Sequence, residues 1–166
     1  MDQIKSDLKK LGYYQIAGGI AGIGVIIWAV VALSTFAGIV VFLYSLMLLF
    51  FAFSIYCGLQ CLQLKRAAIK LSLINQYAQL LGFIILGYGF SYVAGVHISV
   101  GLDFTNEFKF LLNAGVSNIN MEFNGDGKEL VVNINAVAIA LIVWIDKLQV
   151  KAEGDNKQML DLSTMT

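Results

Sequence analysis

Hydrophobic positions in this chain gather into long runs without charge. Residues 16–33 carry no charged side chain, and after a break at Ser34 and Thr35 a second uncharged run extends over 36–60. A helix needs about 17–25 apolar residues to cross the hydrocarbon core of a bilayer. The pattern therefore predicts two membrane spans, about 16–34 and 36–62. The short break between them predicts an antiparallel hairpin.

Two later stretches predict a third and a fourth span. Residues 80–100 carry no Asp, Glu, Lys or Arg, which predicts a span over about 78–100. The fourth span, about 130–148, is strongly apolar only over 136–145. It reaches a spanning length only by including Asn133 and Asn135, whose amides are unfavourable in hydrocarbon.

The region before the fourth span has an alternative interpretation. Apolar and polar residues alternate over 119–123 and again over 130–134, on either side of a turn-forming Asn-Gly-Asp-Gly segment at 124–127. Alternation that flanks such a turn predicts a β-hairpin. Both interpretations hold if the hairpin stands outside the membrane and the helix begins near Asn135.

Lysine and arginine predict the orientation, because these residues concentrate in cytoplasmic segments. They gather before the first span, between the second and third, and in the tail, namely Lys5, Lys9, Lys10, Lys65, Arg66, Lys70, Lys147, Lys151 and Lys157. Four spans place all three segments on one side. The expected fold is therefore an all-α integral membrane protein: a four-transmembrane-helix bundle with both termini cytoplasmic. It has a single membrane domain over 1–150, an extracytoplasmic loop over 101–129 and a polar cytoplasmic tail over 151–166.

Composition supports the membrane class. The chain of 166 residues is 58% hydrophobic and 13% charged, against about 45–50% and about 25% in a typical soluble domain. The formal net charge is zero, so no basic field favours nucleic acid as a partner. The two cysteines, Cys57 and Cys61, lie one helical turn apart, a spacing that a regular helix does not bring into good disulfide geometry.

Small residues recur at helical spacing in two of the predicted spans. Gly18 and Gly22 form a GxxxG pair, and Gly87, Ser91 and Gly95 follow at intervals of four. Helices in lipid associate through close contact at such residues. We expect these residues to pack the helices of one bundle together. A dimerisation face is the alternative.

A few polar positions are candidates for function. His97 and Asp103 near the outer boundary could form a pH-sensitive pair, or His97 could simply reach lipid headgroups. Gln60 lies near the cytoplasmic end of the second span. Asn75 and Gln76 fall close to one face of a helix, where they line an entrance, bind a partner or cap the third span.

No catalytic motif, nucleotide-binding loop or metal-ligand cluster is evident in the sequence, so no enzyme activity, cofactor or metal is expected. The expected function is that of a small accessory, structural or regulatory subunit that packs against a larger membrane complex. A homo-oligomeric channel or small-solute permeation protein is the alternative. The expected partners are membrane lipids and other membrane subunits or further copies of the chain. The expected location is a plasma membrane or bacterial inner membrane, with several passes.

Overall fold

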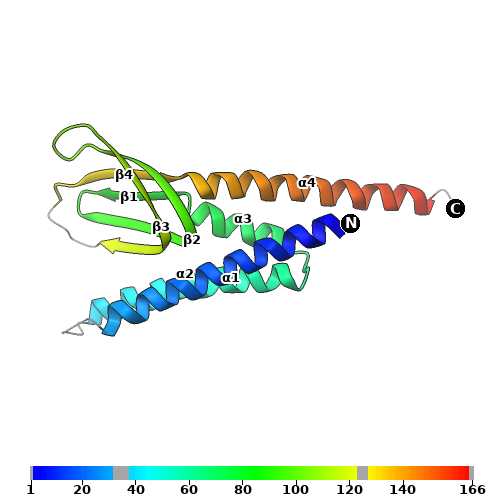
Figure 1. Cartoon of the computed structure of the whole chain (residues 1–166), viewed down its shortest axis with the longest axis horizontal. Coiled ribbons are helices and arrows are strands. Elements are labelled where there is room, and N and C mark those ends of the chain that lie inside the picture. Colours follow the sequence, from blue (N-terminus) through cyan, green and yellow to red (C-terminus); the bar gives the residue numbers. More distant parts are fainter. Residues whose placement is uncertain (1, 32–37, 123–126, 165–166) are drawn as a thin grey trace.

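The computed structural model describes residues 2–31, 38–122 and 127–164, which form helices and a four-stranded sheet. The elements follow in the order α1 (Asp2–Val31), α2 (Gly38–Leu62), α3 (Ala68–Ala78), β1 (Leu81–Ile85), β2 (Tyr88–Asp103), β3 (Lys109–Glu122), β4 (Leu130–Asn135) and α4 (Ala136–Thr164). The molecule is elongated, with the sheet beside one end of the α1–α2 pair (Figure 1). The expected all-α bundle of four transmembrane helices is therefore wrong.

The predicted helical hairpin is present as α1 and α2. Among the described helices, these two alone are long and apolar enough to cross a membrane. Glycine lets them approach closely: a Cβ added to Gly12 would lie 2.8 Å from the carbonyl oxygen of Gly58, and one added to Gly22 would overlap the ring of Phe51. A large side chain at either position would force the helices apart.

The third predicted span is a pair of strands instead of a helix. Residues 78–100 run from the end of α3 through β1 into β2, with Ile85 paired to Tyr88 across a two-residue turn. Both turn residues, Leu86 and Gly87, have positive φ (53° and 81°), as a tight type I′ hairpin turn requires. Gly87, Ser91 and Gly95 therefore belong to a turn and a strand, and they form no helical ridge. An apolar run of this kind suits a strand or a helix equally, because hydrophobicity alone does not separate them.

The fourth predicted span is a strand followed by a helix. β4 ends at Asn135, and α4 begins at Ala136. The Asn135 side chain accepts hydrogen bonds from the N–H groups of Val137 (3.1 Å) and Ala138 (3.4 Å), so it caps the helix. The helix thus starts near the residue that the alternative interpretation gave. α4 continues through the expected tail to Thr164.

Strands are present on both sides of the Asn-Gly-Asp-Gly segment, but they do not pair with each other. The strand order is β1-β4-β2-β3, with an additional pairing of β1 with β2. β3 therefore pairs with β2, whereas β4 lies between β1 and β2. The expected loop over 101–129 is largely the end of β2 and the whole of β3.

The pairings close the strands into a ring. The first part of β2 pairs with β1 (Phe90 with Phe83), and its last part pairs with β4 (Gly101 with Asn133). β4 in turn pairs with β1 (Asn133 with Gly82). β2 makes both connections because it bends at a bulge between Val93 and Val96, a feature that sharpens the local twist of a strand.

The bend of β2 rests on α1. Gly95 at the bend has φ +112°, a conformation that L side chains rarely adopt. Its N–H donates to the hydroxyl of Ser117 (2.9 Å), and that hydroxyl donates to the carbonyl oxygen of Gly18 on α1 (2.9 Å). A Cβ added to Gly18 would lie 2.5 Å from the main chain of Ala94. In the GxxxG pair, Gly18 therefore packs against β2, whereas Gly22 packs against Phe51 of α2.

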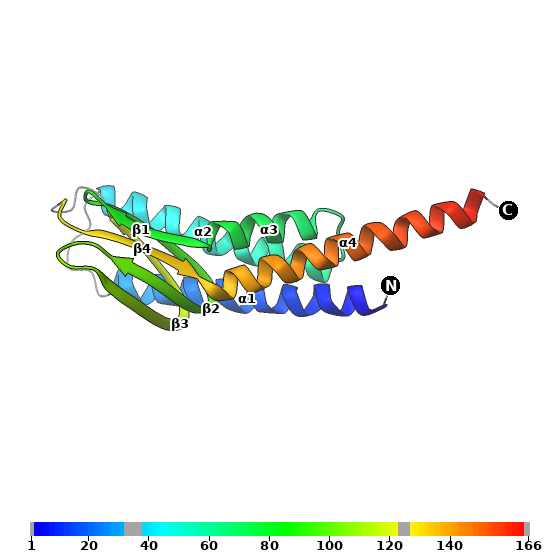
Figure 2. The ribbon, with the colours of Figure 1, turned by 90° about the horizontal axis from the view of Figure 1, so that it is seen from above.

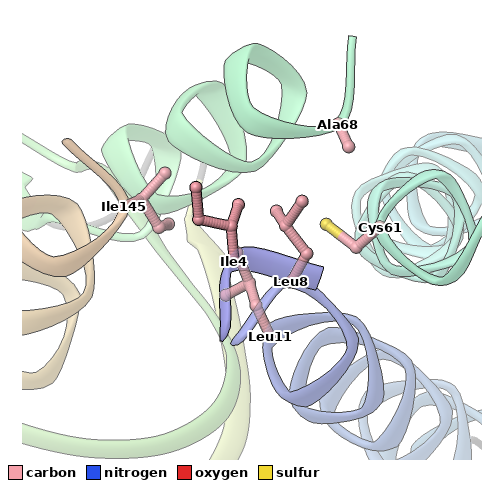
Figure 3. Close-up of a cluster of buried hydrophobic side chains, with 6 residues drawn as sticks. All are labelled: Ile4, Leu8, Leu11, Cys61, Ala68 and Ile145. Carbon is pink, nitrogen blue, oxygen red and sulfur yellow. The ribbon is translucent and has the colours of Figure 1, made fainter. Parts of the chain in front are cut away.

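Two apolar clusters hold the molecule together. The first joins α1, α2, α3 and α4 around the start of α1 (Figure 3) and consists of Ile4, Leu8, Leu11, Cys61, Ala68 and Ile145. The second joins the hairpin to the sheet and consists of Ile26, Met47, Phe51, Tyr92 and Ala94. The sheet is thus packed directly on the apolar length of α1 and α2.

In the part of the chain that the structure describes, charged residues lie towards the two ends of the molecule. Residues 11–64, 71–102, 110–121 and 130–145 contain no Asp, Glu, Lys or Arg. The start of α1, the α2–α3 connection and the later part of α4 lie at one end. The connections of the sheet strands lie at the other, and Figure 2 shows both termini away from them. At about 3.3 Å per strand residue and 1.5 Å per helix residue, the uncharged part of β4 and α4 extends roughly 35 Å.

Candidate functional site

The concave side of the strand ring is polar. A cavity of about 150 Å³ is lined there by Phe83, Ile84, Ser91, Val93, His97, Ser99, Asn113, Asn118, Asn120 and Asn133. None of these lining residues is Asp, Glu, Lys or Arg. The cavity therefore offers hydroxyl, amide and imidazole groups without a fixed charge.

Glycine on neighbouring strands makes room for these polar side chains. Gly115 is the direct cross-strand partner of His97, and a Cβ built on it would lie 3.0 Å from His97 Cε1. Gly101 is the direct partner of Asn133, and its added Cβ would collide with the Asn133 amide. A Cβ on Gly82 would lie 3.0 Å from the hydroxyl oxygen of Ser91.

The cavity is deep at β2 and accessible along β3. His97 is only 5% exposed, and its Nδ1 is buried without a hydrogen-bond partner among the described residues. Asn113, Asn118 and Asn120 on β3 are exposed. The asparagine side of the lining is therefore open to solvent, whereas His97 is almost fully enclosed.

The suggested pair of His97 and Asp103 is not brought together. Six residues separate them along β2, roughly 20 Å of strand. Asp103 accepts a hydrogen bond from the N–H of Thr105 (2.8 Å). Hydrogen bonds from Thr105 lower the pKa of the Asp103 carboxyl from its ordinary value.

A second polar group forms a buried hydrogen-bond network where the helices meet the sheet. Ser72 of α3 donates to Gln15 Oε1 of α1 (3.2 Å), and Ser54 of α2 donates to the Gln15 carbonyl oxygen (3.1 Å). Asn75 Nδ2 donates to the hydroxyl of Ser54 (3.2 Å), and the hydroxyl of Tyr92 contacts Asn75 Oδ1 (3.2 Å). All five side chains are essentially inaccessible. The network joins α1, α2, α3 and β2.

The other polar candidates lie on α2 and α3. Gln76 is buried next to this network, and neither of its amide atoms has a hydrogen-bond partner among the described residues. Asn75 is a member of the network itself, so both residues face the protein interior. Gln60 is partly exposed near the end of α2, where its carbonyl oxygen accepts from the N–H of Lys65 (3.1 Å).

Most of the cavity is not evident from the sequence. Of its lining residues, the sequence pattern indicates His97 as a candidate and marks Asn133 only as unfavourable in a membrane span. It gives no indication of Asn113, Asn118 and Asn120. The usable signal was the repeated placement of asparagine in otherwise apolar, uncharged segments.

The part of the chain that the structure describes contains neither a cluster of metal-ligating side chains nor a disulfide between Cys57 and Cys61. No three His, Cys, Asp or Glu side chains gather there in a way that would hold a metal ion. Cys57 and Cys61 are free and buried.

Comparison with known proteins adds no assignment. No protein-family model matches this chain, and no match was found among curated proteins or among solved structures. Its function must therefore be inferred from the site and the surface of the molecule.

Proposed function

We propose that this protein is a non-enzymatic subunit of a membrane-protein complex, inserted through the α1–α2 hairpin and docked on its partner through the sheet. The observation that carries the proposal is a broad apolar surface, which we call the outer sheet face. It consists of Val96, Ile98 and Val100 on β2 and Phe110, Leu112 and Val116 on β3. All six are exposed, with Phe110 at 74% and Leu112 at 78%.

These six residues share one side of the β2–β3 pair. Val96 pairs directly with Val116, and Val100 pairs with Leu112. Side chains that are directly opposite lie on the same face of a sheet. Exposed apolar patches of this kind mark protein or membrane contacts.

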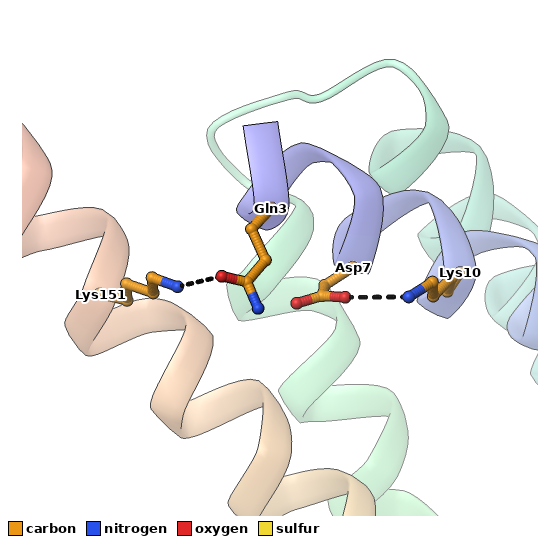
Figure 4. Close-up of polar contacts among 4 residues, drawn as sticks. All are labelled: Gln3, Asp7, Lys10 and Lys151. Atoms are coloured by element: carbon orange, nitrogen blue, oxygen red, sulfur yellow. Dashed lines mark hydrogen bonds and ion pairs between the residues drawn. The ribbon is translucent and has the colours of Figure 1, made fainter. Parts of the chain in front are cut away.

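The distribution of charge supports insertion in a membrane. The uncharged zone crosses every element, and its length of roughly 35 Å along β4 and α4 is close to the roughly 30 Å of a bilayer core. The end with the termini carries most of the basic residues, which favours a cytoplasmic position for that end. Both termini belong to it: Lys151 Nζ of α4 donates to Gln3 Oε1 of α1 (3.0 Å; Figure 4). In this proposal two helical spans suffice to hold both termini on the cytoplasmic side.

The free edge of the sheet favours a protein partner over lipid alone. Among the described strands, β3 pairs with β2 only. Acyl chains cannot satisfy the N–H and carbonyl groups of an open strand edge, and each unsatisfied group in hydrocarbon costs several kcal/mol. A neighbouring protein segment that covers β3 removes this cost.

The alternative of a homo-oligomeric channel has less support. Its best polar stripe would use Ser54 of α2 or Tyr92 of β2, and both side chains take part in the buried network instead. Tyr56 lies on α2 but is exposed on another side of the helix from Ser54.

Site-specific photocrosslinking in native membranes tests the proposal. A photoreactive amino acid at Leu112 should give a discrete adduct with a different protein. The matched control is the same probe at Trp28 on α1, which is 76% exposed but lies outside the outer sheet face, and it should not give that adduct. Adducts with lipid alone would contradict the proposal. So would an adduct at twice the mass of the chain, since it would assign the face to self-assembly.

A further inference from the structure

We infer that the cavity inside the strand ring is a binding site for a small uncharged solute rich in hydroxyl or amide groups. This inference is independent of the proposed docking function. It rests on the cavity lining, the glycines that shape it and the buried imidazole that belongs to the lining.

The hydrogen-bonding groups of the lining complement those of such a solute. An asparagine amide provides two donors and an acceptor oxygen, and a serine hydroxyl both donates and accepts. Asn118, Asn120 and Asn133 therefore match hydroxyl and amide groups, which also donate and accept. Ser91 and Ser99 add two hydroxyls from β2.

One lining residue of the cavity, His97, has a buried nitrogen without a partner among the described residues. His97 is 95% buried, yet Nδ1 has no hydrogen-bond partner among the described residues. A buried polar atom without a partner costs about 1–3 kcal/mol, so native structures nearly always satisfy it. Nδ1 has no surface that a solute could touch in this structure, so a solute satisfies it only when the imidazole turns towards the cavity.

The cavity volume limits the size of a ligand. The cavity volume of about 150 Å³ corresponds to roughly five water molecules at about 30 Å³ each. Gly82, Gly101 and Gly115 keep Cβ atoms away from Ser91, Asn133 and His97 respectively. Glycerol and urea are therefore suitable probes.

The absence of charge in the lining selects against ions. Moving an ion from water into a site without an opposite charge costs far more than moving a neutral polar molecule. The nearest acidic residue along β2, Asp103, lies beyond the lining and is hydrogen-bonded to Thr105.

The single histidine of the chain makes the test direct. The full-length protein is placed in phosphatidylcholine nanodiscs without added polyol, and the imidazole resonances of His97 are followed by NMR. Glycerol or urea should cause a saturable shift, whereas sodium nitrate and sodium chloride should not. A saturable shift with either salt, or none with either neutral probe, would overturn the inference.

Two variants locate the binding. Asn133→Leu replaces the amide that faces Gly101 and should weaken binding about tenfold or more. Gly115→Ala narrows the cavity beside His97 and should also weaken binding. It is the variant to compare if Asn133→Leu does not fold. The matched control is Asn106→Ala, an exposed asparagine outside the lining, which should bind as the parent does. Equal binding by all the folded variants would show that the shift arises elsewhere and would overturn the inference.

Discussion

His97 and Gly115 are direct cross-strand partners, and the imidazole occupies the space that a side chain at 115 would need: a Cβ there would lie 3.0 Å from His97 Cε1. The histidine is buried, whereas the neighbouring Ala114 is exposed. The position of the only histidine in the chain thus depends on a glycine of the next strand.

Replacing this glycine should therefore displace the histidine. Gly115→Val is expected to lower the free energy of unfolding by about 1–3 kcal/mol, the usual cost of overpacking, and to change the NMR resonances of His97. Thermal unfolding in detergent measures the first effect. Ala114→Val is the matched control, because its side chain lies outside the cavity lining, and it should leave both quantities nearly unchanged. Equal effects of the two substitutions would contradict the packing described for His97.

The contact of α1 with β2 gives a second prediction. Gly18→Ala places a methyl group 2.5 Å from the main chain of Ala94 and Gly95, so it should destabilise the protein by about 1–3 kcal/mol. Gly24 lies on the same helix with no atom within 4 Å of its added Cβ. Gly24→Ala should be neutral or stabilising by about 0.5–1 kcal/mol, because alanine favours a helix more than glycine does. If Gly18→Ala were as stable as Gly24→Ala, the sheet would not be seated on α1 as described.

The buried network gives a third prediction. Tyr92→Phe removes the hydroxyl, whose single proton is donated to one of two acceptors within reach, the carbonyl oxygen of Phe50 (2.8 Å) or Asn75 Oδ1 (3.2 Å). Since a buried acceptor then loses its donor, the free energy of unfolding should fall by about 1–3 kcal/mol. The matched control is Tyr13→Phe, whose side chain is 65% exposed and whose loss of a hydroxyl should have little effect. Unfolding in denaturant compares the two, and similar stabilities would show that the Tyr92 hydroxyl contributes nothing.

The proposed orientation gives a fourth prediction. In a background with Cys57→Ala and Cys61→Ala, Glu107→Cys should react with a membrane-impermeant thiol reagent on intact cells. Ser6→Cys, near the start of α1, should react only after the membrane is opened. Both positions are exposed in the structure, so accessibility of the side chain itself does not explain a difference. Labelling of residue 6 from outside would reverse the orientation.

The helical hairpin was predictable because α1 and α2 carry the signal that a membrane helix needs, which is a long uncharged run. The segment 80–100 carries the same signal, yet it folds as strands. Its hairpin turn uses Leu86 at positive φ, a residue that seldom takes this conformation, so the sequence contains no recognisable turn there. The ring itself depends on pairings between distant segments, which local patterns do not report.

The region from 109 to 135 was partly predictable. Alternation indicated strands on either side of residues 124–127, and Asn135 marked the start of a helix. The partners of the strands were not predictable from proximity in sequence, since β4 lies between β1 and β2 while β3 takes the outer edge of β2. The cavity was missed for the same reason, because its asparagines come from strands whose register is set by the ring.

The insertion of β4 between β1 and the last part of β2 has a consequence for biosynthesis. During translation β4 emerges after all the other strands. The edges of β1 and β2 that pair with β4 therefore stay unpaired until residue 135 has left the ribosome. Open strand edges invite pairing with other chains, and partly folded intermediates aggregate through them. A nascent chain that stalls before residue 130 thus cannot complete its sheet, and its open strand edges remain available to other chains.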